Sequence, residues 1–136
     1  MNLANMESVK FVKIGFSLLF IILLVLNFSN NTFSQDKKPK PKVTFIELGS
    51  VNCIPCKKMQ PIMKSIKERY GEQLEVIFYD VWKPEQKKFA EIYRIRVIPT
   101  QVFLDDKGKE FFRHEGFFPE SEIDKILQNK GLKVKK

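Results

Sequence analysis

Two spacings of apolar residues alternate along the chain and predict strands and helices in turn. The runs VTFIELG (Val43–Gly49) and LEVIFYDV (Leu74–Val81) are short, rich in β-branched and aromatic residues, and predict buried strands. The segment TQVFLDDKGKEFFRHEG (Thr100–Gly116) contains turn residues at Asp105–Gly108 and predicts a hairpin. The sequence therefore predicts at least three strand-forming regions.

Three segments between and after these strands have helical spacing. Cys56–Tyr70 carries apolar residues at steps of three and four, and Pro61 should kink this helix. Its predicted buried positions are Met59, Ile62, Met63, Ile66 and Tyr70. Pro84–Ile95 begins with a proline, which suits a helix start, and Pro119–Leu127 predicts a last helix. Their predicted inward positions are Phe89, Ile92 and Tyr93, and Ile123, Ile126 and Leu127.

The predicted order of elements is β-α-β-α-β-β-α, which indicates an α/β fold. The first crossover makes a parallel pair of strands and the hairpin adds antiparallel strands. We therefore expect a mixed β-sheet with helices on both faces, formed by residues 43–132.

The N-terminal region has a different pattern. Lys10 and Lys13 precede fifteen uncharged residues, Ile14–Phe28, fewer than the ~20 that span a bilayer comfortably. This predicts that residues 1–34 are an export signal cut after Ser34, or a membrane anchor that is kept. Either outcome places the folded part in the periplasm or at the outer face of the cytoplasmic membrane.

The distribution of charge marks a linker and a tail on either side of the predicted domain. The formal net charge is +8, and positive residues crowd into a Pro/Lys linker at residues 35–42 and a basic tail at residues 133–136. A polyanion site would suit such a pattern, but no nucleic-acid motif accompanies it, so we expect solvated surface and no nucleic-acid partner.

The two cysteines of the chain lie in SVNCIPCKK, as Cys53 and Cys56. A structural zinc needs four ligands, and His114 is the one histidine of the sequence, so we expect no metal site. Copper(I) held by two thiolates stays an alternative. A purely structural disulfide would stabilise little, because it closes a very short loop.

Redox chemistry fits the position of the pair between a strand and a helix. A helix N-terminus favours a negative sulfur, so Cys53 is the predicted nucleophile. Cys56, one turn into the helix, would resolve the mixed disulfide. Pro55 restrains the loop that holds both sulfurs.

The segments FIELGSVNCIPCKKMQP and IRVIPTQVF resemble the thioredoxin family over residues 43–132. The matching residues are Cys53, Pro55, Cys56, Pro61, Ile98, Pro99 and Thr100. The resemblance implies a thioredoxin-like fold and a cis Pro99 packed against the cysteines, with the backbone before it pairing with the substrate. It also puts Glu47 where the family carries a buried acid, which would exchange a proton with Cys56. The alternative is that Glu47 points to solvent.

Departures from the family pattern concern recognition. Asn52 replaces the usual tryptophan, Ile54 replaces a glycine, and the family's first strand and helix are missing. The predicted substrate-binding residues are Asn52, Ile54, Pro55, Ile98 and Pro99. Lys57, Trp82 and His114 are interpreted as surface or structural residues.

These observations predict an exported thiol–disulfide oxidoreductase, a monomer that needs no cofactor beyond its cysteines. Pro55 and Glu47 resemble the reducing members of the family, so we expect a reductase. The expected partners are a disulfide-bearing client protein and a membrane thiol-transfer protein that donates electrons, with a possible membrane tether. The alternatives are an oxidase or isomerase of exported disulfides, and a copper(I)- or thiol-binding carrier.

Overall fold

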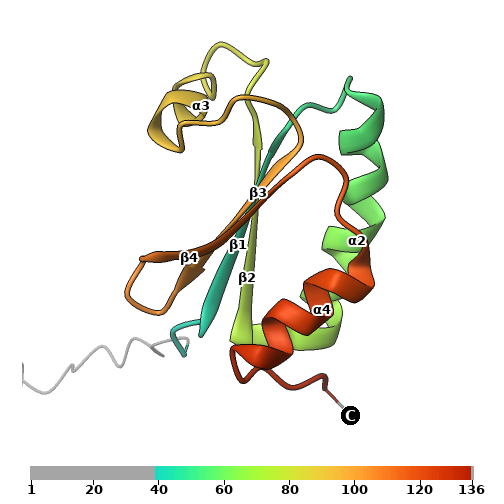
Figure 1. Ribbon diagram of the computed structural model, residues 1–136, viewed down its shortest axis with the longest axis vertical. Coiled ribbons are helices and arrows are strands. Elements are labelled where there is room, and N and C mark those ends of the chain that lie inside the picture. The colour runs from blue at the N-terminus through green and yellow to red at the C-terminus, as the bar shows by residue number, and fades with distance from the viewer. Residues whose placement is uncertain (1–38, 136) are drawn as a thin grey trace, which may run out of the picture. The chain divides into compact units, whose positions relative to one another are not determined.

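A four-stranded sheet organises residues 39–135, the part of the chain that the computed structural model describes. The strand order is β2-β1-β3-β4, and Figure 1 shows the strands crossing the centre of the molecule. The strands are β1 (Val43–Gly49), β2 (Leu74–Asp80), β3 (Thr100–Asp105) and β4 (Glu110–Glu115). β2 is parallel to β1, whereas β1–β3 and β3–β4 are antiparallel pairs. The predicted mixed sheet is confirmed.

The central strand β1 has the predicted bounds and is covered on both faces. Phe45 and Glu47 point to one face, while Ile46 and Leu48 contribute to a separate apolar cluster on the other. Burial on both faces explains why the strand is a nearly continuous apolar run rather than an alternating one.

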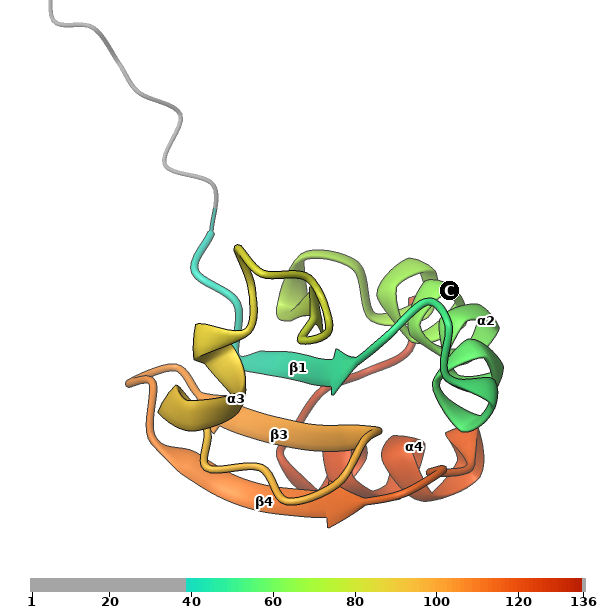
Figure 2. The ribbon, with the colours of Figure 1, turned by 90° about the horizontal axis from the view of Figure 1, so that it is seen from above.

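Helices α2 (Ile54–Tyr70) and α4 (Glu120–Asn129) cover one face of the sheet, as the two views show together (Figures 1 and 2). The 3-10 turn η2 (Gly71–Gln73) links α2 to β2. α2 begins two residues earlier than predicted, because Pro55 suits the first turn of a helix, and it continues past Pro61. The core on this face includes Phe45, Met59, Ile66, Tyr70, Phe103, Ile123 and Leu127.

The opposite face carries α3 (Lys88–Ile92), where the predicted helix Pro84–Ile95 is wrong in extent. Residues before Lys88 form turns, because Gln86 Oε1 accepts a hydrogen bond from the amide of Asp80 at 2.6 Å. The helix ends early because Arg94 has a φ of 50°, in the left-handed region.

The packing of α3 corrects one of its predicted inward residues. Phe89 stacks on Tyr79 with ring centroids 3.7 Å apart, and Tyr93 packs nearby. Ile92, predicted to face inward, is 61% exposed.

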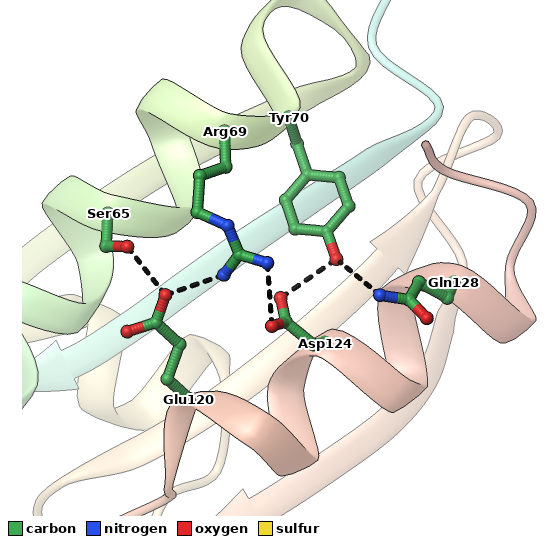
Figure 3. Close-up of polar contacts among 6 residues, drawn as sticks. All are labelled: Ser65, Arg69, Tyr70, Glu120, Asp124 and Gln128. Atoms are coloured by element: carbon green, nitrogen blue, oxygen red, sulfur yellow. Dashed lines mark hydrogen bonds and ion pairs between the residues drawn. The ribbon is translucent and has the colours of Figure 1, made fainter. Parts of the chain in front are cut away.

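A polar network joins α2 to α4, and we call it the α2–α4 seam (Figure 3). Its members are Ser65, Arg69, Tyr70, Glu120, Asp124 and Gln128. The Arg69 guanidinium lies 2.7 Å from Glu120 Oε1 and 2.9 Å from Asp124 Oδ2. The Tyr70 hydroxyl donates to Asp124 Oδ1 at 2.8 Å. The seam therefore fixes α4 along α2.

The predicted signal or anchor, residues 1–34, and the first part of the linker at residues 35–42 lie outside the described residues, so both stay predictions. Within residues 39–135, no helix is long and apolar enough to cross a membrane. The start of the basic tail packs on the domain, since Gln73 and Lys133 exchange two hydrogen bonds.

Candidate active site

The two cysteines lie where β1 passes into α2, and they are joined in a disulfide. Cys53 is the N-cap of α2, with extended backbone (φ −88°, ψ 125°). The amide of Cys56 donates to Cys53 Sγ at 3.4 Å, and the two Cα atoms are 5.2 Å apart. The structure therefore places Cys53 at the helix N-terminus, as the sequence predicts.

The surroundings of the two sulfurs differ. Cys53 is 7% exposed, whereas Cys56 is fully buried. No acidic residue occupies the first turn of α2, so the free N–H groups and the helix dipole favour a negative charge on Cys53 when the disulfide opens. Cys53 therefore keeps a small exposed surface, while Cys56 has none.

Gly49 lets Cys56 pack directly on the end of β1. A Cβ at position 49 would lie 3.2 Å from both Cβ and Sγ of Cys56 and 3.3 Å from the Phe78 ring. These distances are tighter than ordinary van der Waals contacts, so a larger residue would push the cysteine away. Glu47 lies two residues earlier on the same face of β1.

Glu47 is fully buried, which excludes the alternative that it points to solvent. Neither of its carboxyl oxygens has a hydrogen-bond partner among the described residues. Burial raises the pKa of Glu47 to about 8, although the neighbouring Gln101 amide opposes this rise. At neutral pH the carboxyl group is therefore mostly protonated beside the disulfide.

Pro99 lies at the same end of the sheet as the disulfide. The Ile98–Pro99 peptide bond is cis, as the resemblance implies. Thr100 follows it and pairs with Leu48, so Pro99 comes next to the end of β1. The carbonyl of Pro99, itself a buried residue, accepts a hydrogen bond from the amide of Gly116 at 2.7 Å.

The other predicted substrate-binding residues are accessible to different degrees. Asn52, Ile54 and Pro55 are exposed, and Ile54 is 74% exposed. Ile98 is half-buried. A group of three or more side chains able to hold a metal ion does not occur within residues 39–135.

Comparison with known proteins identifies the family. A family model for the thioredoxin-like domain matches residues 30–131. The chain belongs to the thioredoxin-like family. This membership and the Cys53–Cys56 disulfide support thiol–disulfide oxidoreductase activity.

Individual thioredoxins resemble the chain at modest identity. The chloroplastic thioredoxin Y of Oryza sativa is 26% identical over 73% of this chain, which covers 57% of that relative and so spans about half its length. The prophage-derived thioredoxin-like protein YosR of Bacillus subtilis is 30% identical over 61% of this chain and 92% of its own length. The thioredoxin of Malassezia sympodialis superposes with a TM-score of 0.57 at 27% identity, over 69% of this chain and 80% of that one.

Two polar residues of this thioredoxin-like site were missed by sequence reasoning. The buried carboxylate of Asp80 accepts hydrogen bonds from the amides of Val51 (3.4 Å) and Trp82 (3.3 Å). It therefore ties the turn before Cys53 to the loop after β2. Gln101 is fully buried beside Glu47. The available signal was the same for both, a polar residue within or at the end of a buried apolar run.

Exposed apolar side chains surround this end of the thioredoxin-like domain. Val51 and Ile54 flank Cys53, Val97 precedes the cis bond, and Trp82 follows β2, all at least 48% exposed. Phe117, 43% exposed, follows Gly116, whose amide binds Pro99. Trp82, interpreted from the sequence as a structural or surface residue, is 60% exposed.

Proposed function

We propose that this thioredoxin-like chain is a reductase of protein disulfides that works outside the cytoplasm. One observation carries the proposal: Cys53, 7% exposed at a helix N-terminus, stands before a fully buried Cys56 on the face that holds Glu47. The proposal gives the two sulfurs different roles and makes Glu47 the proton acceptor on the buried side.

The first step is attack on the client. The Cys53 thiolate forms a bond to one sulfur of the client disulfide, the client S–S bond breaks, and the other client sulfur leaves as a thiolate that takes a proton from water. A mixed disulfide between Cys53 and the client results.

The second step releases the client. The ionised fraction of Glu47, which is the minor form at neutral pH, takes the proton of Cys56, and the Cys56 thiolate then attacks Cys53 Sγ. The second client sulfur leaves and takes a proton from water. Two electrons pass from the protein dithiol to the client, and Glu47 ends protonated beside a closed disulfide, which matches its raised pKa.

The reducing direction is supported by Pro55 within the motif and by the acid at Glu47. In an oxidising compartment the disulfide must then be reduced again, and a membrane thiol-transfer protein is the proposed electron donor. The cysteine pair serves without a further cofactor in this scheme, and the domain acts as a monomer.

The client segment is proposed to bind as an extended chain across Asn52, Ile54 and Pro55 on one side and Ile98 and Pro99 on the other. Exposed apolar side chains on this surface favour a client with apolar residues beside its cysteine. The location outside the cytoplasm rests on the apolar pattern of residues 1–34, which would export the domain or tether it to the membrane.

The reduction potential of the Cys53–Cys56 pair tests the direction. We expect a value near the roughly −270 mV of thioredoxin; a value near the roughly −120 mV of a strong periplasmic oxidant would contradict the proposal. Assays with reduced, scrambled and oxidised clients side by side separate the reductase from an oxidase or isomerase.

A further inference from the structure

Gln101 lies directly opposite Glu47 in the β1–β3 pair, on the same face of the sheet. It is fully buried, and its Nε2 donates to the carbonyl of Gly116 at 3.1 Å. Its Oε1 has no partner among the described residues. A buried glutamine whose Nε2 has a hydrogen-bond partner while its Oε1 has none among the described residues needs an explanation.

The free atom belongs to a small set of unpaired acceptors. Both Glu47 oxygens and Gln101 Oε1 are buried without a hydrogen-bond partner in residues 39–135. Side chains directly opposite in an antiparallel pair have Cβ atoms about 4.5–5.5 Å apart, so the carboxyl and the amide lie side by side. One proton on Glu47 supplies a donor that Gln101 Oε1 can accept.

We propose that Gln101 is a positioning residue for Glu47, whose amide partners the carboxyl group in both protonation states so that Glu47 can take the proton of Cys56. An amide is suited to this role because it both donates and accepts. Oε1 accepts from the protonated carboxyl, and the second hydrogen of Nε2 donates to the carboxylate. The inference rests on the proposed function, because it concerns the same resolving step.

Other titratable groups around Glu47 already have different contacts. Cys56 from α2 is in the disulfide, and Asp80 at the end of β2 accepts two backbone amides. His114 on β4 lies beyond Gln101, with its Nε2 3.2 Å from the Phe117 carbonyl. Among the described residues, Gln101 is thus the polar side chain directly opposite Glu47 in the sheet.

The orientation of Gln101 also depends on the loop that holds Pro99. Gly116 accepts from Gln101 through its carbonyl and donates to Pro99 through its amide. The amide of Gln101 is therefore held in place from the Pro99 side and leaves its free groups for Glu47.

The test is Gln101→Met, which keeps the unbranched shape and removes both hydrogen-bonding functions. The reduced full chain is mixed with an aryl disulfide whose thiolate is coloured. The first equivalent released reports attack by Cys53, and the second reports resolution by Cys56. Cys56→Ser defines the signal of the first release alone.

We expect Gln101→Met to leave the first release unchanged and to slow the second roughly tenfold at neutral pH, part of the ~10²- to 10⁴-fold that a positioned proton acceptor contributes. The rate of the second release should recover at higher pH, because a Glu47 carboxyl without its amide partner loses its proton only at a higher pH. Gln101→Asn, which keeps a shorter amide, should lie between wild type and Gln101→Met. In a Glu47→Gln background, Gln101→Met should add no further effect.

Gln128→Met is the matched control, since it makes the same chemical change in α4, and it should alter neither release. An unchanged second release and pH profile in Gln101→Met would overturn the inference. Equal slowing of both releases would also overturn it, because that indicates a general structural role. A wild-type chain that releases only one equivalent would instead refute the proposed function.

Discussion

Two groups of polar side chains lie against α2, and they differ in burial and in hydrogen bonding. In the α2–α4 seam, Arg69 and Tyr70 each meet the carboxylate of Asp124 within 3 Å, and the charged side chains of Arg69 and Asp124 are partly exposed. At the other end of α2, Glu47 is fully buried beside Cys56 and no described residue satisfies its oxygens.

The difference separates a polar group that stabilises from one that reacts. Partnered and partly exposed charges hold two helices together at low desolvation cost. A buried carboxyl without a partner destabilises the fold, and its pKa is moved toward the range useful for proton transfer. The contrast therefore predicts that activity and stability respond in opposite ways at the two ends of α2.

The largest expected effect comes from Cys53→Ser. Removing the nucleophile should abolish reduction of a protein disulfide such as that of insulin, because Cys56 is fully buried and cannot replace it. Turbidity of reduced insulin measures the activity. Asp124→Asn in the seam is the control and should keep wild-type activity; loss of activity in both variants would contradict the contrast.

Glu47→Leu should change the pH dependence of stability. The pKa of Glu47 is raised from 4.5 in the unfolded chain to about 8 in the folded protein, so the folded protein holds this proton more tightly. The stability that comes from holding the proton is fully present below pH 4.5 and is lost as the pH rises through about 8. The loss is on the order of 5 kcal/mol for such a shift. Urea unfolding of both proteins from about pH 4 to about pH 9, the range in which Glu47 changes its protonation, measures the difference in their free energies of unfolding.

Wild type should therefore lose stability relative to Glu47→Leu as the pH rises through this window. Parallel pH curves for the two proteins would mean that Glu47 ionises in the folded state as it does in the unfolded chain. As a control, wild type and Gln128→Met should show parallel curves of unfolding free energy against pH.

Asp124→Ala tests the other end of α2. It removes the acceptor of the Tyr70 hydroxyl and one of the two carboxylate partners of Arg69, and we expect a loss of about 1–2 kcal/mol in the free energy of unfolding. Thiol release by the reduced protein should not change. A slower second release in this variant would show that the seam also serves the site.

The smallest effect is expected for Lys125→Ala. Its ammonium group pairs with Glu122 on the surface of α4 at 2.7 Å, with side chains 67% and 46% exposed. Such pairs contribute little, so thermal unfolding should give a stability within about 0.5 kcal/mol of wild type. A larger change would show that α4 depends on its outer surface as well as on the seam.

Features that depend on nearby residues could be predicted from the sequence. The bounds of β1 and the place of Cys53 at the start of α2 follow from local apolar runs, a glycine and a proline. The short α3 could not be predicted, because Gln86 is held by the backbone of Asp80 at the end of β2.

The residues that contact Glu47 and the turn before Cys53 could not be predicted either, because these contacts depend on how the strands pair. Gln101 meets Glu47 only because β3 pairs with β1 in one alignment, and a shift by one residue would turn it to the other face. Asp80 reaches the turn before Cys53 because β2 runs parallel to β1. Residue types alone do not report such contacts.

The central claim is that Cys53 attacks and Cys56 resolves, and trapping the mixed disulfide tests it most directly. Reduced Cys56→Ser and Cys53→Ser proteins are mixed with a disulfide-bearing peptide, and the adducts are quantified by mass spectrometry after acid quench. The account predicts rapid accumulation of a peptide adduct on Cys53 of Cys56→Ser and very little on Cys56 of Cys53→Ser. Equal accumulation on both cysteines would contradict the division of roles.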